Sequence, residues 1–269
     1  KKGRRKNKLE VCQLWQCKLC QRVFSAKLTK HKTYPVKAII EGLSLYNKGF
    51  SLSDACRLLK KQSSFPVHPS TLSGWLKEFE LLIPYLHLRE RGIQMYAPKN
   101  LIKTVRLQHN QIYSYRVHLA KLDLLPSSKD SHLLSPIRDY LLEMLVDCPH
   151  NLFLNSQRAS SKSAQYDLDQ VEIRSIETSA SEMAQFVLQT VTNNHHRHEA
   201  IQKFMIINNS ATVAVEVPIL LYPDDIEHLR KSLGFYVPLE IDSVLTGHIY
   251  ILQIRNGKLY IIDYKPNAV

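Results

Sequence analysis

The carboxy-terminal end contains three runs that favour β-strands, and these runs limit the possible fold more than any other feature. They are residues 211–221 (ATVAVEVPILL), 247–254 (GHIYILQI) and 258–264 (KLYIIDY), all rich in β-branched and aromatic side chains. Asn256-Gly257 lies between the last two runs, and this dipeptide favours a two-residue hairpin turn. The sequence therefore predicts a β-sheet here, preceded by a helix that starts near Ser179.

Residues 34–80 have the apolar spacing of three short helices. Pro35 can open the first helix, Ser51 or Ser53 can cap the second, and Pro69 can start the third. Three helices of this size match the arrangement in which the last helix enters the major groove of DNA. The alternative is a three-helix bundle without a ligand.

If the third helix reads DNA, its first turns meet base edges and nearby lysines meet phosphates. The expected contacts are Ser70, Thr71 and Ser73 at the bases, and Lys60, Lys61 and Lys77 at the phosphates. Trp75 is expected in the core of the unit.

The excess positive charge is confined to the first third of the chain. Residues 1–80 hold 17 of the 36 Lys and Arg residues but only 5 of the 24 Asp and Glu residues, whereas the remainder is balanced. Such an asymmetry is typical of a polyanion-binding module joined to an ordinary globular domain. A basic tail that only adds solubility is the simpler alternative.

Cys17 and Cys20 form a C-x-x-C knuckle, which can supply two thiolates to a tetrahedral Zn²⁺. Cys12 is a candidate third ligand, and His31 could complete the set. Two unligated thiols are the alternative, because one knuckle provides only half of a four-ligand site. The five cysteines are unevenly spaced, which argues against a secreted disulfide framework.

Residues 12–80 resemble the zinc-ribbon and helix-turn-helix head of many bacterial and archaeal transposases. The resemblance rests on the knuckle, on Tyr34-Pro-Val-Lys37 and on PSTLSGW at 69–75. It implies a DNA-binding head in a mobile-element context. The first knuckle of that family's ribbon is missing, and the three separated carboxylates of a transposase catalytic domain are not found downstream.

Asp263 and Lys265 form an Asp-x-Lys pair at the end of the last strand run. Side chains two apart in a strand project from the same face, so this pair could hold Mg²⁺ and orient a water molecule. An isolated pair of this kind is more often an ordinary strand-end ion pair.

The order of the predicted elements favours the metal-site interpretation of Asp263 and Lys265 over the ordinary ion pair. Residues 180–268 resemble the PD-(D/E)xK nuclease superfamily, closest to its RecB-like branch. The resemblance rests on the order of four predicted elements: a helix with RHEAIQ, a strand with VAVEVPILL, a strand with LTGHIYIL and a strand ending in YIIDYKP. The resemblance implies a Mg²⁺ or Mn²⁺ site whose ligands are Glu216, Asp263 and His198. It also implies catalytic roles for Glu216, Asp263, Lys265 and Glu199.

Tyr250 departs from that family's pattern, which has a metal-binding Asp three residues after the glycine that is Gly247 here. A phenol with a pKa of about 10 is a poor ligand for Mg²⁺ at neutral pH. Three functions follow as alternatives: a DNA hydrolase impaired by Tyr250, a non-catalytic DNA-binding regulator on a decayed nuclease fold, or a transposase-related protein.

We therefore expect an α+β, multidomain protein. Its segments are a basic segment with a partial zinc ribbon (1–33), a helix-turn-helix domain (34–80), a helical connecting region (81–177) and a truncated restriction-endonuclease-like domain (178–269). Within the connecting region, His109–Lys121 has polar and aromatic side chains at helical spacing. DNA is the expected partner, with a homodimer as one option, no membrane association and a cytoplasmic, nucleoid-associated location.

Overall fold

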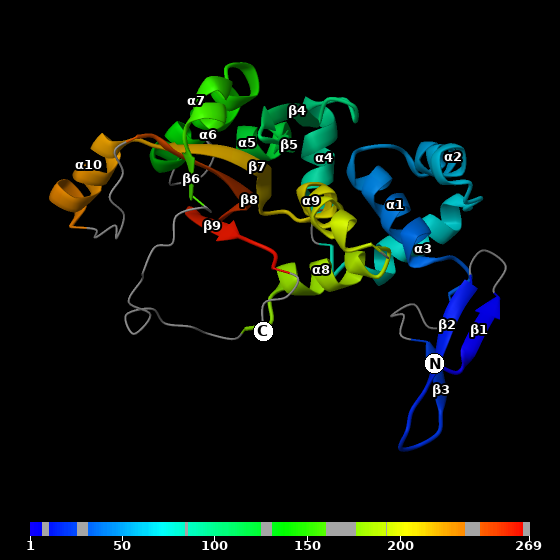
Figure 1. Ribbon diagram of the computed structural model, residues 1–269. Coiled ribbons are helices and arrows are strands. Elements are labelled where there is room, and N and C mark those ends of the chain that lie inside the picture. Colours follow the sequence, from blue (N-terminus) through cyan, green and yellow to red (C-terminus); the bar gives the residue numbers. More distant parts are fainter. Residues whose placement is uncertain are drawn as a thin grey trace. The chain divides into compact units, whose positions relative to one another are not determined.

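The computed structural model describes residues 1–6, 11–25, 32–83, 86–124, 131–159, 176–191, 193–234 and 243–265 (Figure 1). The chain divides into two compact units, each made of two segments. Unit 1 comprises Lys1–Pro98 and Glu177–Ser210, and unit 2 comprises Lys99–Ile176 and Ala211–Val269. The described residues form an α+β protein, as the sequence predicts.

Unit 1 begins with a three-stranded antiparallel sheet of order β1-β2-β3. Its strands are β1 (Gly3–Lys6), β2 (Val11–Gln16) and β3 (Val23–Ser25). The turn between β2 and β3 holds Cys17 and Cys20, and the backbone N–H of Cys17 donates to Arg22 O at 2.9 Å. The knuckle therefore lies at the tip of a hairpin.

The three predicted helices of residues 34–80 are confirmed. They are α1 (Val36–Asn47), α2 (Leu52–Ser63) and α3 (Pro69–Glu78). Ser51 caps α2, because its Oγ accepts from the backbone N–H of Asp54 at 3.0 Å. The three helices pack on one another through buried apolar side chains, including Ile39, Leu59, Leu72 and the predicted core residue Trp75.

Unit 1 also contains α4 (Leu86–Met95) and a short 3₁₀ turn, η4 (Asn194–His196). Two later helices, α8 (Ser179–Leu188) and α9 (Arg197–Asn208), belong to unit 1 as well, and both pack on α1. A buried amide pair joins α1 to α9, with Asn47 Nδ2 donating to Asn208 Oδ1 at 2.9 Å.

This grouping differs from the predicted domain at 178–269. The spacing of apolar residues in α8 and α9 correctly predicts helices, but it does not specify which core they complete. In the structure, Phe186 and Phe204 are buried within unit 1, and Phe186 lies 5.0 Å from the ring of Phe79. The two helices therefore extend the trihelical core.

Unit 2 is built on a six-stranded sheet with the strand order β4-β5-β7-β8-β6, in which β9 also pairs with β8. The strands are β4 (Ile102–His109), β5 (Gln111–His118), β6 (Gln157–Arg158), β7 (Thr212–Leu221), β8 (Leu245–Arg255) and β9 (Lys258–Ile262). All pairs are antiparallel except β6 with β8. The helices are α5 (Leu119–Leu124), α6 (Ser131–Val146), α7 (His150–Asn155) and α10 (Pro223–Leu233).

The predicted helical character of 81–177 is wrong for residues 102–118, which form the β4–β5 hairpin. Its turn is at Asn110, which adopts a left-handed φ of 62°. The buried side chains Leu107, Tyr115 and Val117 follow the two-residue period of strands, and they pack in the core of unit 2. The helical spacing seen in His109–Lys121 was therefore coincidental.

The three predicted carboxy-terminal strands are confirmed as β7, β8 and β9. Asn256 and Gly257 have φ values of 49° and 72°, which is the backbone of a tight hairpin turn. The helix α10, between β7 and β8, was not predicted. Among the described helices, none combines the length and apolar character needed to cross a membrane.

A buried lysine gives unit 2 a testable dependence on pH. Lys121 is 4% exposed, and its Nζ donates to Thr212 O at 2.9 Å. Burial holds the pKa of Lys121 well below its usual value, because the charged form loses hydration.

Lys121→Met is expected to flatten the rise of stability with pH. In the unfolded chain this lysine keeps a proton up to a pKa of about 10.4, whereas the folded protein releases it earlier. The wild-type protein therefore gains up to ~1.4 kcal/mol per pH unit just below pH 10.4, and methionine removes that gain. Urea unfolding at several pH values measures the slope. The exposed lysine variant Lys99→Met is the control, and an unchanged slope in Lys121→Met would contradict the assignment.

Candidate functional site

Glu216, Tyr250 and Asp263 lie on or directly after three neighbouring strands of unit 2. The pairs Val215↔Ile251 and Val217↔Ile249 place Glu216 of β7 opposite Tyr250 of β8. The pair Ile251↔Ile262 places Asp263, the residue after β9, opposite Tyr250 on the other side. Glu216 and Asp263 are thus two strands apart, about 10 Å at their backbones, with Tyr250 between them.

Glu216 has an unusual backbone. Its φ of 54° lies in the left-handed region, although it is neither a glycine nor part of a turn. Such a conformation costs roughly 1–3 kcal/mol in a non-glycine residue, and it is enriched at functional sites. The strain coincides with the position that the family resemblance assigns to the first carboxylate.

Tyr250 is a neutral group at this position. Burial raises the pKa of its phenol above the usual value, and the nearby charges of Glu216 and Asp263 raise it further. The side chain is only 8% exposed. At neutral pH it therefore brings a protonated oxygen, rather than an anionic ligand, to a place between two carboxylates.

Asp263 and Lys265 form an ion pair in which Lys265 Nζ lies 2.6 Å from Asp263 Oδ2. Both side chains are accessible, since their exposed fractions are 48% and 69%. Solvent screens such a pair, so it contributes little to stability. The pair is consistent with both earlier readings: a strand-end ion pair, and a lysine placed beside a metal-binding carboxylate.

The expected helical ligands belong to the other compact unit. His198 and Glu199 lie in the first turn of α9, in unit 1, whereas Glu216 and Asp263 belong to unit 2. Glu199 pairs with Lys203 one helical turn later, at 2.7 Å. The family-derived roles of His198 and Glu199 therefore gain no support from their surroundings.

The candidate DNA-reading face lies on α3 and the end of α2. Ser70 is exposed at the start of α3, and Thr71 and Ser73 are half-buried beside it. The surface beside Gly74 is open, because no atom lies within 4 Å of the position that a Cβ would occupy. The three predicted phosphate contacts, Lys60, Lys61 and Lys77, are exposed on the same helices.

The cysteine knuckle lies in a tight turn, in which the backbone N–H of Gln21 donates to Cys17 O at 3.1 Å. Hydrogen bonds from the backbone of Cys20 and then Leu19 hold the pKa of the Cys17 thiol below its usual value. Within the described segments, no third His, Cys, Asp or Glu joins the pair. His31 and the side chain of Cys12 lie outside the described residues.

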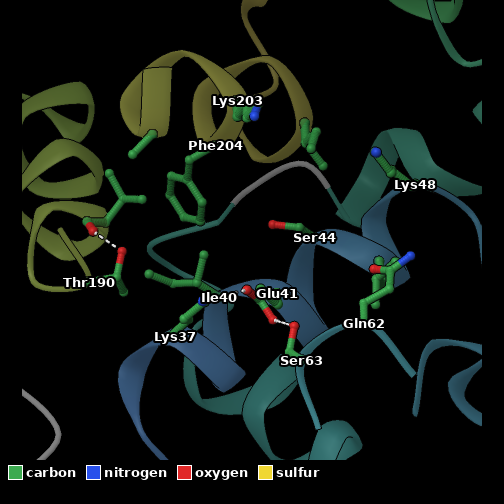
Figure 2. Close-up of a pocket in the computed structure, with 14 residues that line it drawn as sticks. Lys37, Ile40, Glu41, Ser44, Lys48, Gln62, Ser63, Thr190, Lys203 and Phe204 are labelled. Carbon is green, nitrogen blue, oxygen red and sulfur yellow. Dashed lines mark hydrogen bonds and ion pairs between the residues drawn. The ribbon is translucent and has the colours of Figure 1, made fainter. Parts of the chain in front are cut away.

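A groove of about 510 Å³ lies in unit 1 between α1, the end of α2 and α9 (Figure 2). Ile40 and Phe204 line it together with polar side chains. Two of its lysines face carboxylates, since Lys37 Nζ lies 3.8 Å from Glu41 Oε1 and Lys203 pairs with Glu199. The charged residues of its lining are three lysines, Lys37, Lys48 and Lys203, and one carboxylate, Glu41.

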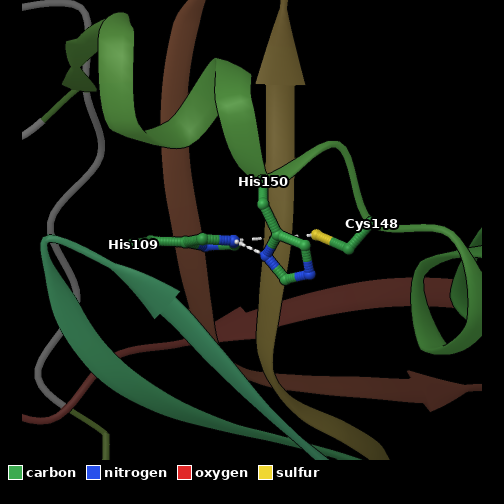
Figure 3. Close-up of side chains that lie close together, drawn as sticks. All are labelled: His109, Cys148 and His150. Carbon is green, nitrogen blue, oxygen red and sulfur yellow. Dashed lines mark hydrogen bonds between the residues drawn. The ribbon is translucent and has the colours of Figure 1, made fainter.

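A second cluster in unit 2 was missed by the sequence analysis. His109 ends β4, Cys148 precedes α7 and His150 begins α7, and their side chains converge (Figure 3). His109 Nε2 lies 3.0 Å from His150 Nδ1 and 3.8 Å from Cys148 Sγ. The closely spaced Cys148-Pro149-His150 was the available signal, but nothing in the sequence links it to His109.

Comparisons with known proteins add no family assignment. The sequence matches no family model, and neither a curated protein nor a solved structure is significantly similar to it.

Proposed function

We propose that this chain is a DNA-binding protein whose unit 2 hydrolyses DNA phosphodiesters with Mg²⁺ or Mn²⁺, in a mobile-element or DNA-processing context. The observation that carries the proposal is the alignment of Glu216, Tyr250 and Asp263 on neighbouring strands. Lys265 lies beside Asp263, as the Asp-x-Lys motif requires. Two features depart from the nuclease pattern: Tyr250 stands in place of the motif Asp, and the helix with His198 and Glu199 belongs to unit 1.

The residues of the proposed nuclease site have two different roles, metal binding and the positioning of water. Glu216 and Asp263 are the carboxylates that would hold the divalent cation, which when bound would neutralise charge on the phosphate. Lys265 Nζ lies 2.6 Å from Asp263 Oδ2, where it would orient the attacking water. The water oxygen would bond to phosphorus as the bond to the leaving sugar oxygen breaks. The attacking water would give a proton to solvent, and the leaving oxygen would take a proton from solvent to become a hydroxyl group.

Unit 1 supplies the DNA-binding part of the proposal. Its surface carries the small polar side chains of α3 beside the exposed lysines Lys60, Lys61 and Lys77. Phosphate contacts of this kind fix a protein on DNA, and contacts at base edges select the sequence. The excess positive charge of residues 1–80 favours the same assignment.

A second candidate is a DNA-binding protein without catalysis. Tyr250 favours it, because a buried neutral phenol replaces a carboxylate between Glu216 and Asp263. Mg²⁺ takes oxygen ligands and strongly prefers carboxylates among side chains, so this substitution weakens the site.

Cleavage of linear and circular DNA tests the proposal. We expect slow cutting by the wild-type protein that requires Mg²⁺ or Mn²⁺ and stops in EDTA. Lys265→Ala is expected to lower the rate at least ~100-fold, because it removes the group that positions water. Lys258→Ala, an exposed lysine of β9, is the matched control and should cut normally. DNA binding without cutting would favour the second candidate.

A further inference from the structure

The cluster of His109, Cys148 and His150 contains the ligand types of a transition-metal site. Its three ligand atoms all lie within 4.8 Å of one another. In a tetrahedral Zn²⁺ site, bonds of about 2.0 Å to nitrogen and 2.3 Å to sulfur separate two nitrogens by about 3.3 Å and a nitrogen from sulfur by about 3.5 Å. The observed separations of 3.0 Å and 3.8 Å lie within a few tenths of an ångström of these values.

The surroundings of His109 orient it as a ligand. Its ring stacks on Phe153, with centroids 3.9 Å apart and planes inclined by 9°. Its other nitrogen, Nδ1, lies 3.0 Å from His248 Nε2. A metal-binding imidazole commonly donates its second N–H to a neighbouring acceptor, which fixes the tautomer and the ring orientation. His248 is held in turn by stacking on Tyr113, with centroids 3.7 Å apart.

The cluster can be reached from solvent on one side. His109 and Cys148 are buried, with exposed fractions of 2% and 8%, whereas His150 is exposed. A metal ion would therefore enter from the side of His150.

We propose that unit 2 binds one transition-metal ion of the Zn²⁺ class through His109 Nε2, Cys148 Sγ and His150 Nδ1. His248 orients the ring of His109 through its contact with His109 Nδ1. Three protein ligands leave a fourth position for water or another small ligand. Thiolate and imidazole select Zn²⁺-like ions over Mg²⁺, so this site is chemically distinct from the proposed one at Glu216 and Asp263.

The alternative is a metal-free chain of hydrogen bonds. His150 Nδ1–H would donate to His109 Nε2, and His109 Nδ1–H would donate to His248 Nε2. The same 3.0 Å separations fit that chain. The two arrangements differ in whether Cys148 loses its proton to bind a metal.

Cobalt titration of the full chain distinguishes them. The cysteines at 12, 17 and 20 are first changed to serine, so that the knuckle cannot bind Co²⁺. We expect one equivalent of Co²⁺ to give the visible bands of tetrahedral cobalt and a thiolate charge-transfer band, both removed by Zn²⁺. Cys148→Ser should abolish the charge-transfer band. His150→Gln, at an exposed position, should weaken Co²⁺ binding at least ~10-fold.

Matched controls separate ligand loss from general damage. Cys56→Ser changes a buried cysteine of unit 1, and His228→Gln changes an exposed histidine of α10. Both should leave the cobalt spectrum unchanged. Absence of the charge-transfer band before any change at Cys148, or its persistence in Cys148→Ser, would overturn the proposal. Zinc content of the protein as purified gives a second measurement, expected to fall by one equivalent in Cys148→Ser but not in Cys56→Ser.

The outcome is independent of the proposed nuclease activity. Neither Glu216 nor Asp263 contributes a ligand, and the test measures binding rather than DNA cleavage. Failure here would leave the proposed function standing.

Discussion

Tyr250→Asp is expected to raise the affinity of the protein for Mn²⁺ at least ~100-fold. The change places a third carboxylate between Glu216 and Asp263, on the strand between theirs. An added carboxylate is a ligand that the divalent cation prefers, and about 2.8 kcal/mol of added binding free energy gives this change, because every ~1.4 kcal/mol changes Kd tenfold. Titration calorimetry with Mn²⁺ measures the change.

The same variant should also be less stable without metal. Three carboxylates close together repel one another, and the smaller side chain leaves a cavity where a phenol was buried. Mn²⁺ should therefore raise the melting temperature of Tyr250→Asp far more than that of the wild-type protein. Tyr260→Asp, at an exposed position of β9, is the control. Equal Mn²⁺ affinity in Tyr250→Asp and the wild-type protein would show that the three positions do not form a metal site.

Replacing Lys60, Lys61 and Lys77 by glutamine is expected to weaken DNA binding strongly and to reduce its dependence on salt. Each lysine that contacts a phosphate releases about one counterion, so the slope of log affinity against log salt should fall by about 0.9 for each lysine. The loss should be similar for different DNA sequences, because phosphate contacts carry no sequence information. Fluorescence anisotropy at several salt concentrations measures both quantities.

A triple variant of unit 2 controls for the loss of net charge. Lys99, Lys103 and Lys258 are exposed, and their replacement by glutamine removes the same three charges from the other unit. An equal effect in the two triple variants would mean that charge alone, rather than the α2–α3 surface, determines the affinity.

Elements with strong local signals were predictable. Pro35, Ser51 and Pro69 mark the starts of α1, α2 and α3, because helix capping depends on residues only a few positions apart. Asn256-Gly257 likewise specifies the β8–β9 turn through its positive φ values.

Features that depend on distant contacts were not predictable. The strands β4 and β5 carry polar and aromatic side chains at positions that also fit a helix. Their pairing with each other, and of β5 with β7, determines that they are strands. The helix α9 is buried over much of its surface, so its sequence has no single apolar face to indicate which core it joins.

The candidate sites show the same contrast. The strands that carry or precede Glu216 and Asp263, and the hairpin between the last two strands, could be predicted from local residue types. The pairing of β7 with β8, which places the two carboxylates on either side of Tyr250, could not. The cluster at His109 could not, because His109 and Cys148 are brought together only by the packing of α7 near the end of β4.

The most direct test of the account is DNA cleavage by Tyr250→Asp, with and without Lys265→Ala, in the presence of Mg²⁺ or Mn²⁺. We predict that Tyr250→Asp cuts DNA ~10²- to 10³-fold faster than the wild-type protein, given the several kcal/mol that a well-held metal contributes. Adding Lys265→Ala should remove most of that gain. A Tyr250→Asp protein that folds and binds DNA but cuts no faster than the wild-type protein would contradict the assignment of a nuclease site to Glu216, Asp263 and Lys265.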